Sequence, residues 1–270
     1  MPTVVADGAT VHYCATPRTA GDQRPALVLV AGTGLDAQLN FGHLVDAFAA
    51  SHTVYLPDYA GSGLTTQPQG PLTVELLAGQ IAAVAEEAVR QSDGEPVDLL
   101  GYSLGAVIAA AVAALHPHLV RRLIVVAGWP GPHDARQQLG FEVWQRLEQT
   151  DHDLFGRFLQ LTCFSAPFLS AIGEEGVAQL IANAPPITEG MRRHIDLDGR
   201  ADLRDLLPKI TAQTLVIGLT RDQVVPVEQT HKVHEAIAGS RFAEIDSGHL
   251  VVFERPQELV AEVLGFLSAP

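Results

Sequence analysis

The 270-residue chain has only two cysteines, and it has far fewer basic residues than acidic ones. Lysine and arginine total 17 against 31 aspartates and glutamates, which gives a formal net charge of −14. This acidity argues against nucleic acid and anionic membrane surfaces as partners. Cys14 and Cys163 form no metal or redox motif, so we expect two reduced thiols in a cytoplasmic protein.

Long apolar runs and cofactor fingerprints are also missing. No uninterrupted apolar run reaches the length of a membrane span, and the start "MPTVVADGATVHYC" lacks the pattern of a secretion signal. No metal cluster, phosphate loop or dinucleotide fingerprint is present, because "GTG" and "GSG" are too short for one. We therefore expect no metal and no cofactor, and a small molecule as the partner. The sequence leaves the oligomeric state open.

Short apolar runs alternate with longer helical patterns along most of the chain. Hydrophobic residues make up 47% of the composition and charged residues 18%, as is usual for a globular protein. Continuous Val/Ile/Leu runs separated by helices are typical of parallel strands covered on both faces. The pattern predicts an α/β fold with a mostly parallel sheet of about eight strands. The predicted strands are two around the Asp7-Gly8 turn and those at 26–32, 53–59, 97–103, 121–128, 214–220 and 241–247.

Residues 129–207, called the insertion below, read as helical throughout and follow the sixth predicted strand. The expected organisation is therefore a core domain of residues 1–128 and 208–270, interrupted by a helical lid. Both tryptophans and five of the ten phenylalanines lie in the insertion. We expect most of these aromatic side chains to face inward and a minority to line a pocket, with Trp129, Trp144 and Phe158 as tentative substrate contacts.

The stretch "LLGYSLGAV" at 99–107 places Ser103 between two glycines, where a predicted strand gives way to a predicted helix. A turn this sharp strains the backbone and lifts the serine side chain above the sheet. The N–H of Leu104 then lies at a helix N-terminus, where it points at any anion that forms there. One turn can thus supply a nucleophile and half of an oxyanion hole.

A serine hydroxyl needs a base to accept its proton, and the base needs a carboxylate to orient it. His249 follows the last predicted strand directly, at the sheet edge where ligands bind in open parallel sheets. Asp222 follows the strand at 214–220 in the same way. Asp246 is the rival carboxylate, and we favour Asp222 because a loop after a strand can reach a histidine on the neighbouring loop. His194 could also face the pocket.

A second oxyanion donor is expected in the glycine-rich loop after the first buried parallel strand. "VAGTGLD" at 30–36 suggests the N–H of Thr33, with Gly34 as the lesser alternative. Side chains and backbone next to these positions are tentative substrate contacts. These are Gly32, Gly34, Tyr102 and Leu250.

Five motifs in order resemble the α/β-hydrolase superfamily: "VAGTG", "PDYAGSGLT", "LLGYSLGA", "VIGLTRDQVVP" and "DSGHLVVFERPQELVAEVLGFL". The resemblance covers nearly the whole chain and implies Ser103 as nucleophile, Asp222 as acid and His249 as base. It also implies that the insertion is the family's cap. The chain departs from the family at Ala31-Gly32, where many members have His-Gly and the histidine braces the loop. Asp58 and Gly61 are expected to shape a loop near the site.

Together, residues and resemblance predict a serine hydrolase that cleaves a carboxylic ester or lactone through an acyl-enzyme. A serine in the nucleophile position argues against epoxide hydrolase and haloalkane dehalogenase chemistry, which uses aspartate. A thioesterase, a carbon–carbon bond hydrolase, a perhydrolase and an acyltransferase or cyclase would use the same triad. For a thioesterase, Arg192 and Arg193 could serve as basic residues at the entrance. A non-catalytic binding protein on the same fold is the alternative of another class.

Overall fold

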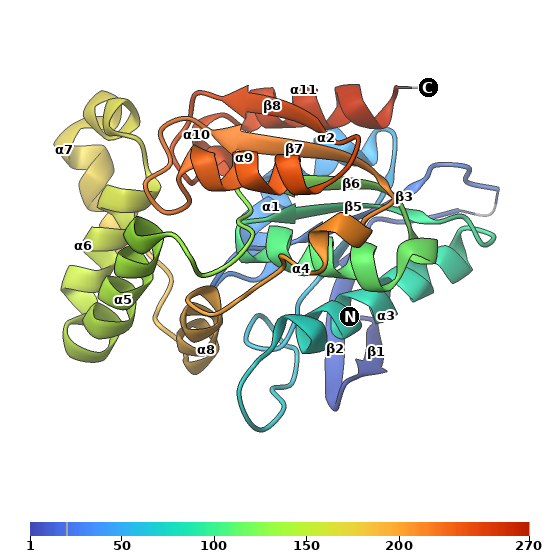
Figure 1. Ribbon diagram of the computed structural model, residues 1–270, viewed down its shortest axis with the longest axis horizontal. Helices are drawn as coiled ribbons and strands as arrows, with labels where there is room; N and C mark the ends of the chain where they lie inside the picture. Colours follow the sequence, from blue (N-terminus) through green and yellow to red (C-terminus); the bar gives the residue numbers. More distant parts are fainter. Residues whose placement is uncertain (20, 270) are drawn as a thin grey trace.

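The computed structural model describes residues 1–19 and 21–269, so the last residue of the predicted core range 208–270 lies outside them (Figure 1). Within those residues the chain forms an eight-stranded sheet of order β1-β2-β4-β3-β5-β6-β7-β8. The first two strands are antiparallel to their neighbours and the other neighbouring pairs are parallel. The predicted fold class is therefore confirmed. The strands are β1 (Thr3–Ala6), β2 (Ala9–Ala15), β3 (Ala26–Val30), β4 (Thr53–Pro57), β5 (Val97–Tyr102), β6 (Val120–Val126), β7 (Gln213–Leu219) and β8 (Arg241–Ile245).

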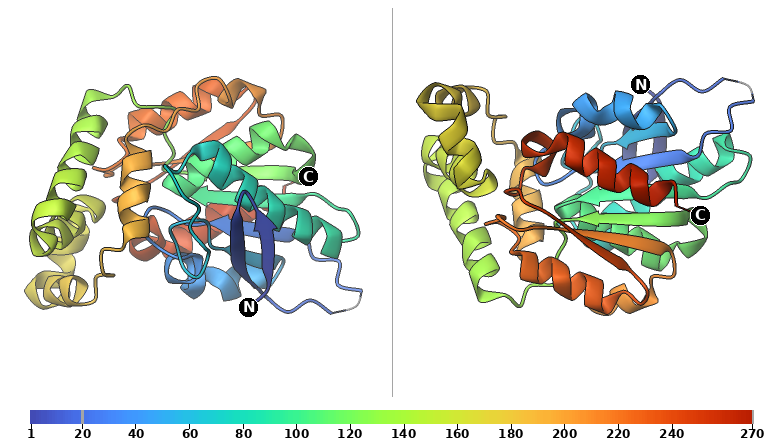
Figure 2. Two further views of the ribbon diagram at one scale, coloured as in Figure 1. Left: turned by 90° about the horizontal axis from the view of Figure 1, so that it is seen from below. Right: turned by 90° about the horizontal axis from the view of Figure 1, so that it is seen from above.

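Helices cover both faces of the sheet, as the two turned views show (Figure 2). One face carries α3 (Val74–Gln91), α4 (Leu104–Leu115) and α9 (Val227–Ala236). The other carries α1 (Ala37–Phe41), α2 (Val45–Ala49) and α11 (Pro256–Leu267). Short helical segments complete these connections. They are η1 (Gly42–Leu44), η2 (Pro117–Leu119), η3 (Leu207–Lys209) and α10 (Val251–Glu254).

The central strands are buried on both faces because side chains alternate between two hydrophobic cores. In β3, Val28 and Val30 belong to the core under α3 and α4, and Leu27 and Leu29 to the core under α1 and α11. All four are fully buried. This explains why the strand reads as an unbroken apolar run rather than an alternating one.

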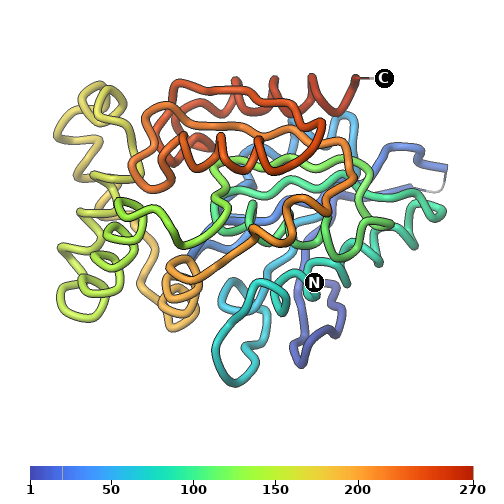
Figure 3. Tube along the Cα trace, in the orientation of Figure 1, coloured from blue at the N-terminus to red at the C-terminus, as the bar shows by residue number. Residues whose placement is uncertain are grey.

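The insertion leaves the sheet after β6 and returns to it at β7, a path that Figure 3 traces. It contains α5 (Ala135–Thr150), α6 (His152–Cys163), α7 (Ala166–Ala182) and α8 (Glu189–Asp198). The strands on either side of it pair directly, in parallel register from Arg122 with Gln213 to Val126 with Ile217. Helices α5 to α7 stand beyond the end of the sheet, whereas α8 lies against the core (Figure 1). The domain boundaries at 129 and 207 stay a prediction.

The described residues contain neither a membrane-spanning helix nor a metal-binding cluster. Across residues 1–19 and 21–269, no helix combines the length and apolarity needed to cross a bilayer. Over the same residues, histidine, cysteine and carboxylate side chains form no group of three that could hold a metal ion.

Candidate active site

Ser103 lies between β5 and α4 with a backbone conformation that non-glycine residues rarely adopt. Its φ is 56° and its ψ is −123°. Strain of this kind costs about 1–3 kcal/mol and persists only where the surroundings hold it. Here the Ser103 N–H donates to the Val126 carbonyl at 2.9 Å, and the Ser103 carbonyl accepts from Ala106 N–H at 2.9 Å. The turn is thus fixed from both the neighbouring strand and the helix that follows.

The two glycines around this turn are required by close backbone approach. A Cβ on Gly101 would overlap the carbonyl of Gly105, where α4 crosses back over β5. A Cβ on Gly105 would overlap the carbonyls of Val30 and Ala31. The motif is therefore explained by contact between strand, helix and the loop after β3.

Three side chains from the ends of β5, β7 and β8 form one hydrogen-bonded row. His249 Nε2 lies 2.9 Å from Ser103 Oγ, and His249 Nδ1 lies 2.6 Å from Asp222 Oδ2. An ionised carboxylate can only accept, so Nδ1 carries the proton and Nε2 is left to accept the one from the serine hydroxyl. All three residues are buried.

The two rival aspartates occupy different environments. Asp222 Oδ1 accepts from the N–H groups of Val224 and Val225 at 2.7 and 2.9 Å, which orients Oδ2 toward His249. Asp246 is on the surface, where its carboxylate pairs with Arg221 and accepts from the Thr220 hydroxyl. Arg221 holds the pKa of Asp246 at about 2. The structure therefore brings Asp222 to the histidine and turns Asp246 away.

The loop after β3 presents its N–H groups unequally. Gly32 N–H donates to Asn40 Oδ1 at 3.0 Å and Gly34 N–H donates to His194 Nδ1 at 3.1 Å. Thr33 N–H, between them, has no partner within residues 1–19 and 21–269, and the same holds for Leu104 N–H at the start of α4. Of the two candidates in this loop, Thr33 is thus the one whose N–H is still available to a ligand.

Tyr59 and Asn40, which the sequence did not single out, and Asp58, which it did, hold the site in place. Tyr59 Oη donates to the carbonyls of Ala31 and Gly32 at 2.9 and 3.1 Å. With Asn40, this supports the loop where the family's histidine is absent. Asp58 Oδ1 accepts from Ala37 N–H at 3.1 Å, which ties the loop after β4 to the start of α1.

The His249 loop is held by side chains beneath and beside it. Tyr102 Oη donates to the His249 carbonyl at 2.7 Å, and its ring is buried in the core under α1 and α11. The Glu254 carboxylate accepts from Gly248 N–H at 3.2 Å and from Ser165 N–H and Oγ at 2.6 and 2.7 Å. Glu254 thereby joins the histidine loop to the start of α7.

The aromatic side chains of the insertion pack mainly on one another. Ring centroids lie 5.7 Å apart for Trp129 and Phe141, 5.9 Å for Phe141 and Trp144, and 6.3 Å for Trp144 and Phe155. Phe158 and Leu250 are half-buried against the same core. Contact of Trp129, Trp144, Phe158 and Leu250 with a substrate stays a prediction.

Both arginines that could have met an acyl carrier have partners within the protein. Arg192 pairs with Glu148 at 2.6 Å, and Arg193 donates to Gln67 Oε1 at 2.7 Å and to the carbonyl of Pro68 at 3.1 Å. They tie α8 to α5 and to the loop before α3, and a contact of either arginine with an acyl carrier stays a prediction.

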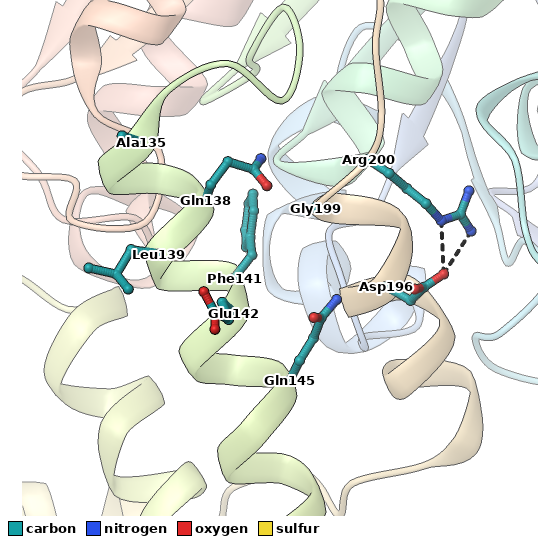
Figure 4. A pocket seen from close by; sticks show the side chains of 9 residues that line it. All are labelled: Ala135, Gln138, Leu139, Phe141, Glu142, Gln145, Asp196, Gly199 and Arg200. Carbon is teal, nitrogen blue, oxygen red and sulfur yellow. Dashed lines mark hydrogen bonds and ion pairs between the residues drawn. The ribbon is translucent and has the colours of Figure 1, made fainter.

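A groove of about 600 Å³ runs between α5 and α8, with Phe141 in its wall (Figure 4). Asp196 and Arg200 of α8 form an ion pair in it, opposite Gln138 and Gln145 of α5. Ser103, Asp222 and His249 do not belong to its walls. It is a feature of the insertion, separate from the hydrogen-bonded row.

The sequence named His194 only as a residue that could face the pocket, and it did not point to Asp198. The two are four apart in "HIDLD", a spacing that puts them on one face of a helix, but exposed helices often carry such pairs. Asn40, Tyr59 and Glu254 act through hydrogen bonds to backbone atoms far away in the chain, which no local pattern reveals.

The fold agrees with comparisons to known proteins. A family model described as "Alpha/beta hydrolase family" matches residues 27–263. Pyrrolizixenacetamide deacetylase of Xenorhabdus hominickii is 38% identical over 99% of this chain and 98% of its own. Pimeloyl-[acyl-carrier protein] methyl ester esterase of Xylella fastidiosa is 28% identical over 90% of this chain and 95% of its own. The crystal structure of the enol-lactonase from Burkholderia xenovorans LB400 superposes with a TM-score of 0.82 at 23% identity, over 99% of this chain and 100% of that one. The chain belongs to the alpha/beta hydrolase family.

Proposed function

We propose that this protein is a serine hydrolase in which Ser103 is the nucleophile, His249 the general base and Asp222 the residue that orients it. The observation that carries the proposal is the continuous row from Asp222 Oδ2 through both ring nitrogens of His249 to Ser103 Oγ, with steps of 2.6 and 2.9 Å. Serine attacks only when its proton has an acceptor, and the row provides one in a buried setting.

In the proposed reaction, Ser103 Oγ forms a bond to the carbonyl carbon while its proton passes to His249 Nε2. The carbonyl electron pair moves onto oxygen, which becomes an oxyanion between the N–H groups of Thr33 and Leu104. Return of that pair breaks the bond to the leaving group, which takes the proton from His249. Water then repeats the sequence on the acyl-enzyme, with His249 accepting its proton, and releases the acid.

Two prearranged N–H donors are the main source of rate in such a site. Removing one such donor from an oxyanion hole typically costs about 10²–10³-fold in kcat. Thr33 N–H is flanked by amides that are already bonded, and Leu104 N–H opens α4, where the helix dipole favours negative charge. Both features support these two amides as the donors.

The proposed substrate is a small, partly apolar carboxylic ester or lactone. Relatives named as a methyl ester esterase and an enol-lactonase favour this class. The aromatic row of the insertion favours an apolar acyl or ring portion, and a closed insertion would exclude water and strengthen the oxyanion contacts. We extend the proposal to a lid role for residues 129–207 and to a cytoplasmic location, which the two free cysteines favour.

A second candidate is a small amide, such as an N-acetyl group. It is favoured by the 38% identical relative that is named a deacetylase of an acetamide. The chemistry differs in one step, because His249 would have to protonate a departing amine rather than an alkoxide.

The test is fluorophosphonate labelling combined with turnover of matched acetyl esters, acetyl amides and lactones. Wild-type protein should be labelled at Ser103, and Ser103→Ala should lose both the label and about 10⁴-fold or more of kcat on an activated ester. Ser268→Ala, an exposed serine far from the row, is the control and should behave as wild type. Wild-type kcat in Ser103→Ala would show that another group is the nucleophile.

A further inference from the structure

One face of α8 packs directly onto two loops that border the candidate site, the loop after β3 and the loop after β4. Gly190, His194 and Asp198 are spaced by four residues, so they lie along one side of the helix, and all three are buried. A Cβ on Gly190 would overlap the backbone of Gly61, so α8 approaches this loop as closely as a helix can. The helix belongs to the insertion by sequence but contacts the core through this face.

His194 links the two loops with both ring nitrogens. Nε2 lies 2.8 Å from the Ala60 carbonyl, which can only accept, and Nδ1 accepts from Gly34 N–H at 3.1 Å. This pattern requires the neutral ring with the proton on Nε2. Burial lowers the pKa of His194 to about 4, so the ring keeps this form at neutral pH. Gly34 N–H is thereby removed from the set of available donors.

Asp198 contacts Thr33, the residue before Gly34. The Thr33 hydroxyl lies 3.0 and 2.8 Å from the two carboxyl oxygens of Asp198, which is 1% exposed. Burial raises the pKa of this carboxyl to about 8. Burying a carboxyl group is costly, and an apolar side chain would fill this space at less cost. We therefore infer that the hydrogen bond to the Thr33 hydroxyl has a role beyond packing.

We propose that His194 and Asp198 are positioning residues, through which α8 holds the Thr33 N–H in place as an oxyanion donor. This rests on the function proposed above. The loop from Gly32 to Gly34 has glycine on both sides of Thr33, so its backbone is free to adopt other conformations unless it is held. His194 and Asp198 restrain it at Gly34 and Thr33, whereas Asn40 and Tyr59 hold Gly32. In this proposal the insertion has two roles: it covers the site as a lid, and its helix α8 positions an oxyanion donor.

The experiment is a double-mutant cycle on the Thr33–Asp198 contact. Thr33→Val and Asp198→Leu remove the hydrogen bond and keep the backbone N–H and the approximate side-chain volume. Each should lower kcat on an activated ester by about 10- to 100-fold with KM within about threefold, because a small misplacement of a donor acts on the transition state. The double variant should lose no more than the worse single variant, since both remove the same contact.

Three further variants serve as controls. Thr33→Ser and Asp198→Asn restore a hydroxyl donor and an oxygen acceptor, and each should stay within about threefold of wild type. Asp196→Asn lies on the same helix but faces the groove of Figure 4, where it pairs with Arg200, and should leave kcat unchanged. Fluorophosphonate titration corrects every rate for the fraction of correctly folded sites.

The affinity for an alkyl trifluoromethyl ketone separates positioning from general damage. Ser103 Oγ adds to its carbonyl carbon, the serine proton passes to His249, and the product is a stable oxyanion without a leaving group. Its inhibition constant should rise in step with the loss of kcat in Thr33→Val and Asp198→Leu. Unchanged inhibition constants, or losses that add in the double variant, would overturn the positioning role. A wild type that neither labels nor turns over esters would overturn the proposed function and this inference together.

Discussion

At the scale of single residues, the role of each group depends on which of its oxygen or nitrogen atoms already has a hydrogen-bond partner. Asp222 uses Oδ1 for two backbone amides and keeps Oδ2 for His249, whereas both oxygens of Asp246 are engaged by Arg221 and Thr220. In the same way, the N–H groups of Gly32 and Gly34 are hydrogen-bonded within the protein, which distinguishes them from the Thr33 N–H. Proximity in sequence, which would favour Asp246 for His249, is a poor guide to these assignments.

Asp222→Asn should therefore lower kcat far more than Asp246→Asn. We expect a loss of about 10⁴-fold for Asp222→Asn, because an amide at this position no longer fixes the proton on Nδ1. Asp246→Asn removes an exposed ion pair that is screened by solvent, and should change kcat by less than about threefold. Steady-state kinetics on one activated ester measures both, with circular dichroism as the check on folding. The reverse order of losses would move the orienting role to Asp246.

How far the sequence can predict the site follows from the same residues. Ser103 follows β5 directly, and Asp222 and His249 lie in the loops that follow β7 and β8, so the strand ends place all three at one edge of the sheet. His194 and Asp198 could not be assigned, because α8 meets the loop after β3 only through tertiary packing of the insertion. Tyr102 is adjacent to Ser103 in the sequence, which suggested a substrate contact. Its hydroxyl is instead bonded to the His249 carbonyl, a partner that the sequence does not indicate.

At the scale of elements, the turn from β5 into α4 combines strain with close packing. The predicted strand and helix are present within one or two residues of their expected bounds because both are strongly apolar and uninterrupted. The insertion was predicted to be helical, and its four helices in the described residues agree with this. Their arrangement against the core could not be derived, since a buried helix face is compatible with many docking positions.

Gly105→Ala should destabilise the fold, and Gly140→Ala should not. The new methyl at Gly105 meets two backbone carbonyls that cannot move without shifting β3, which costs about 1–3 kcal/mol or more. Gly140 lies inside α5 with nothing within 4 Å of the added carbon, so alanine there should stabilise by about 0.5–1 kcal/mol. Urea midpoints report both changes. Equal midpoints for the two variants would contradict the close approach at Gly105.

At the scale of the whole molecule, buried titratable groups make the stability of the fold depend on pH. His194 has a folded-state pKa of about 4 against 6.5 for the unfolded chain. Its contribution to stability is complete above pH 6.5 and is lost as the pH falls toward 4, because only the unfolded chain takes up the proton. Asp198, whose folded-state pKa is raised to about 8, acts in the opposite sense, since its contribution is lost as the pH rises toward 8.

Comparison of wild type with His194→Gln isolates the histidine from the other groups. The difference in unfolding free energy between the two should shrink by about 3 kcal/mol between pH 7 and pH 4, as the shift of His194 implies. His118→Gln, which replaces an exposed histidine, is the matched control for the substitution itself. Urea unfolding at each pH provides the values. A constant difference for His194→Gln would mean that the ring takes up its proton equally in the folded and the unfolded chain.

The direct pairing of β6 with β7 has a consequence for how such a protein can diversify. These two strands are joined by hydrogen bonds along their length, so the insertion between them is a long connection outside the sheet. Changes in α5, α6 or α7 therefore need not displace Ser103, Asp222 or His249. By contrast, α8 is bound to the loop after β3 by the side chains of His194 and Asp198. If the insertion is the lid proposed above, we expect substitutions in its outer helices to change substrate preference and substitutions in the buried face of α8 to change the rate.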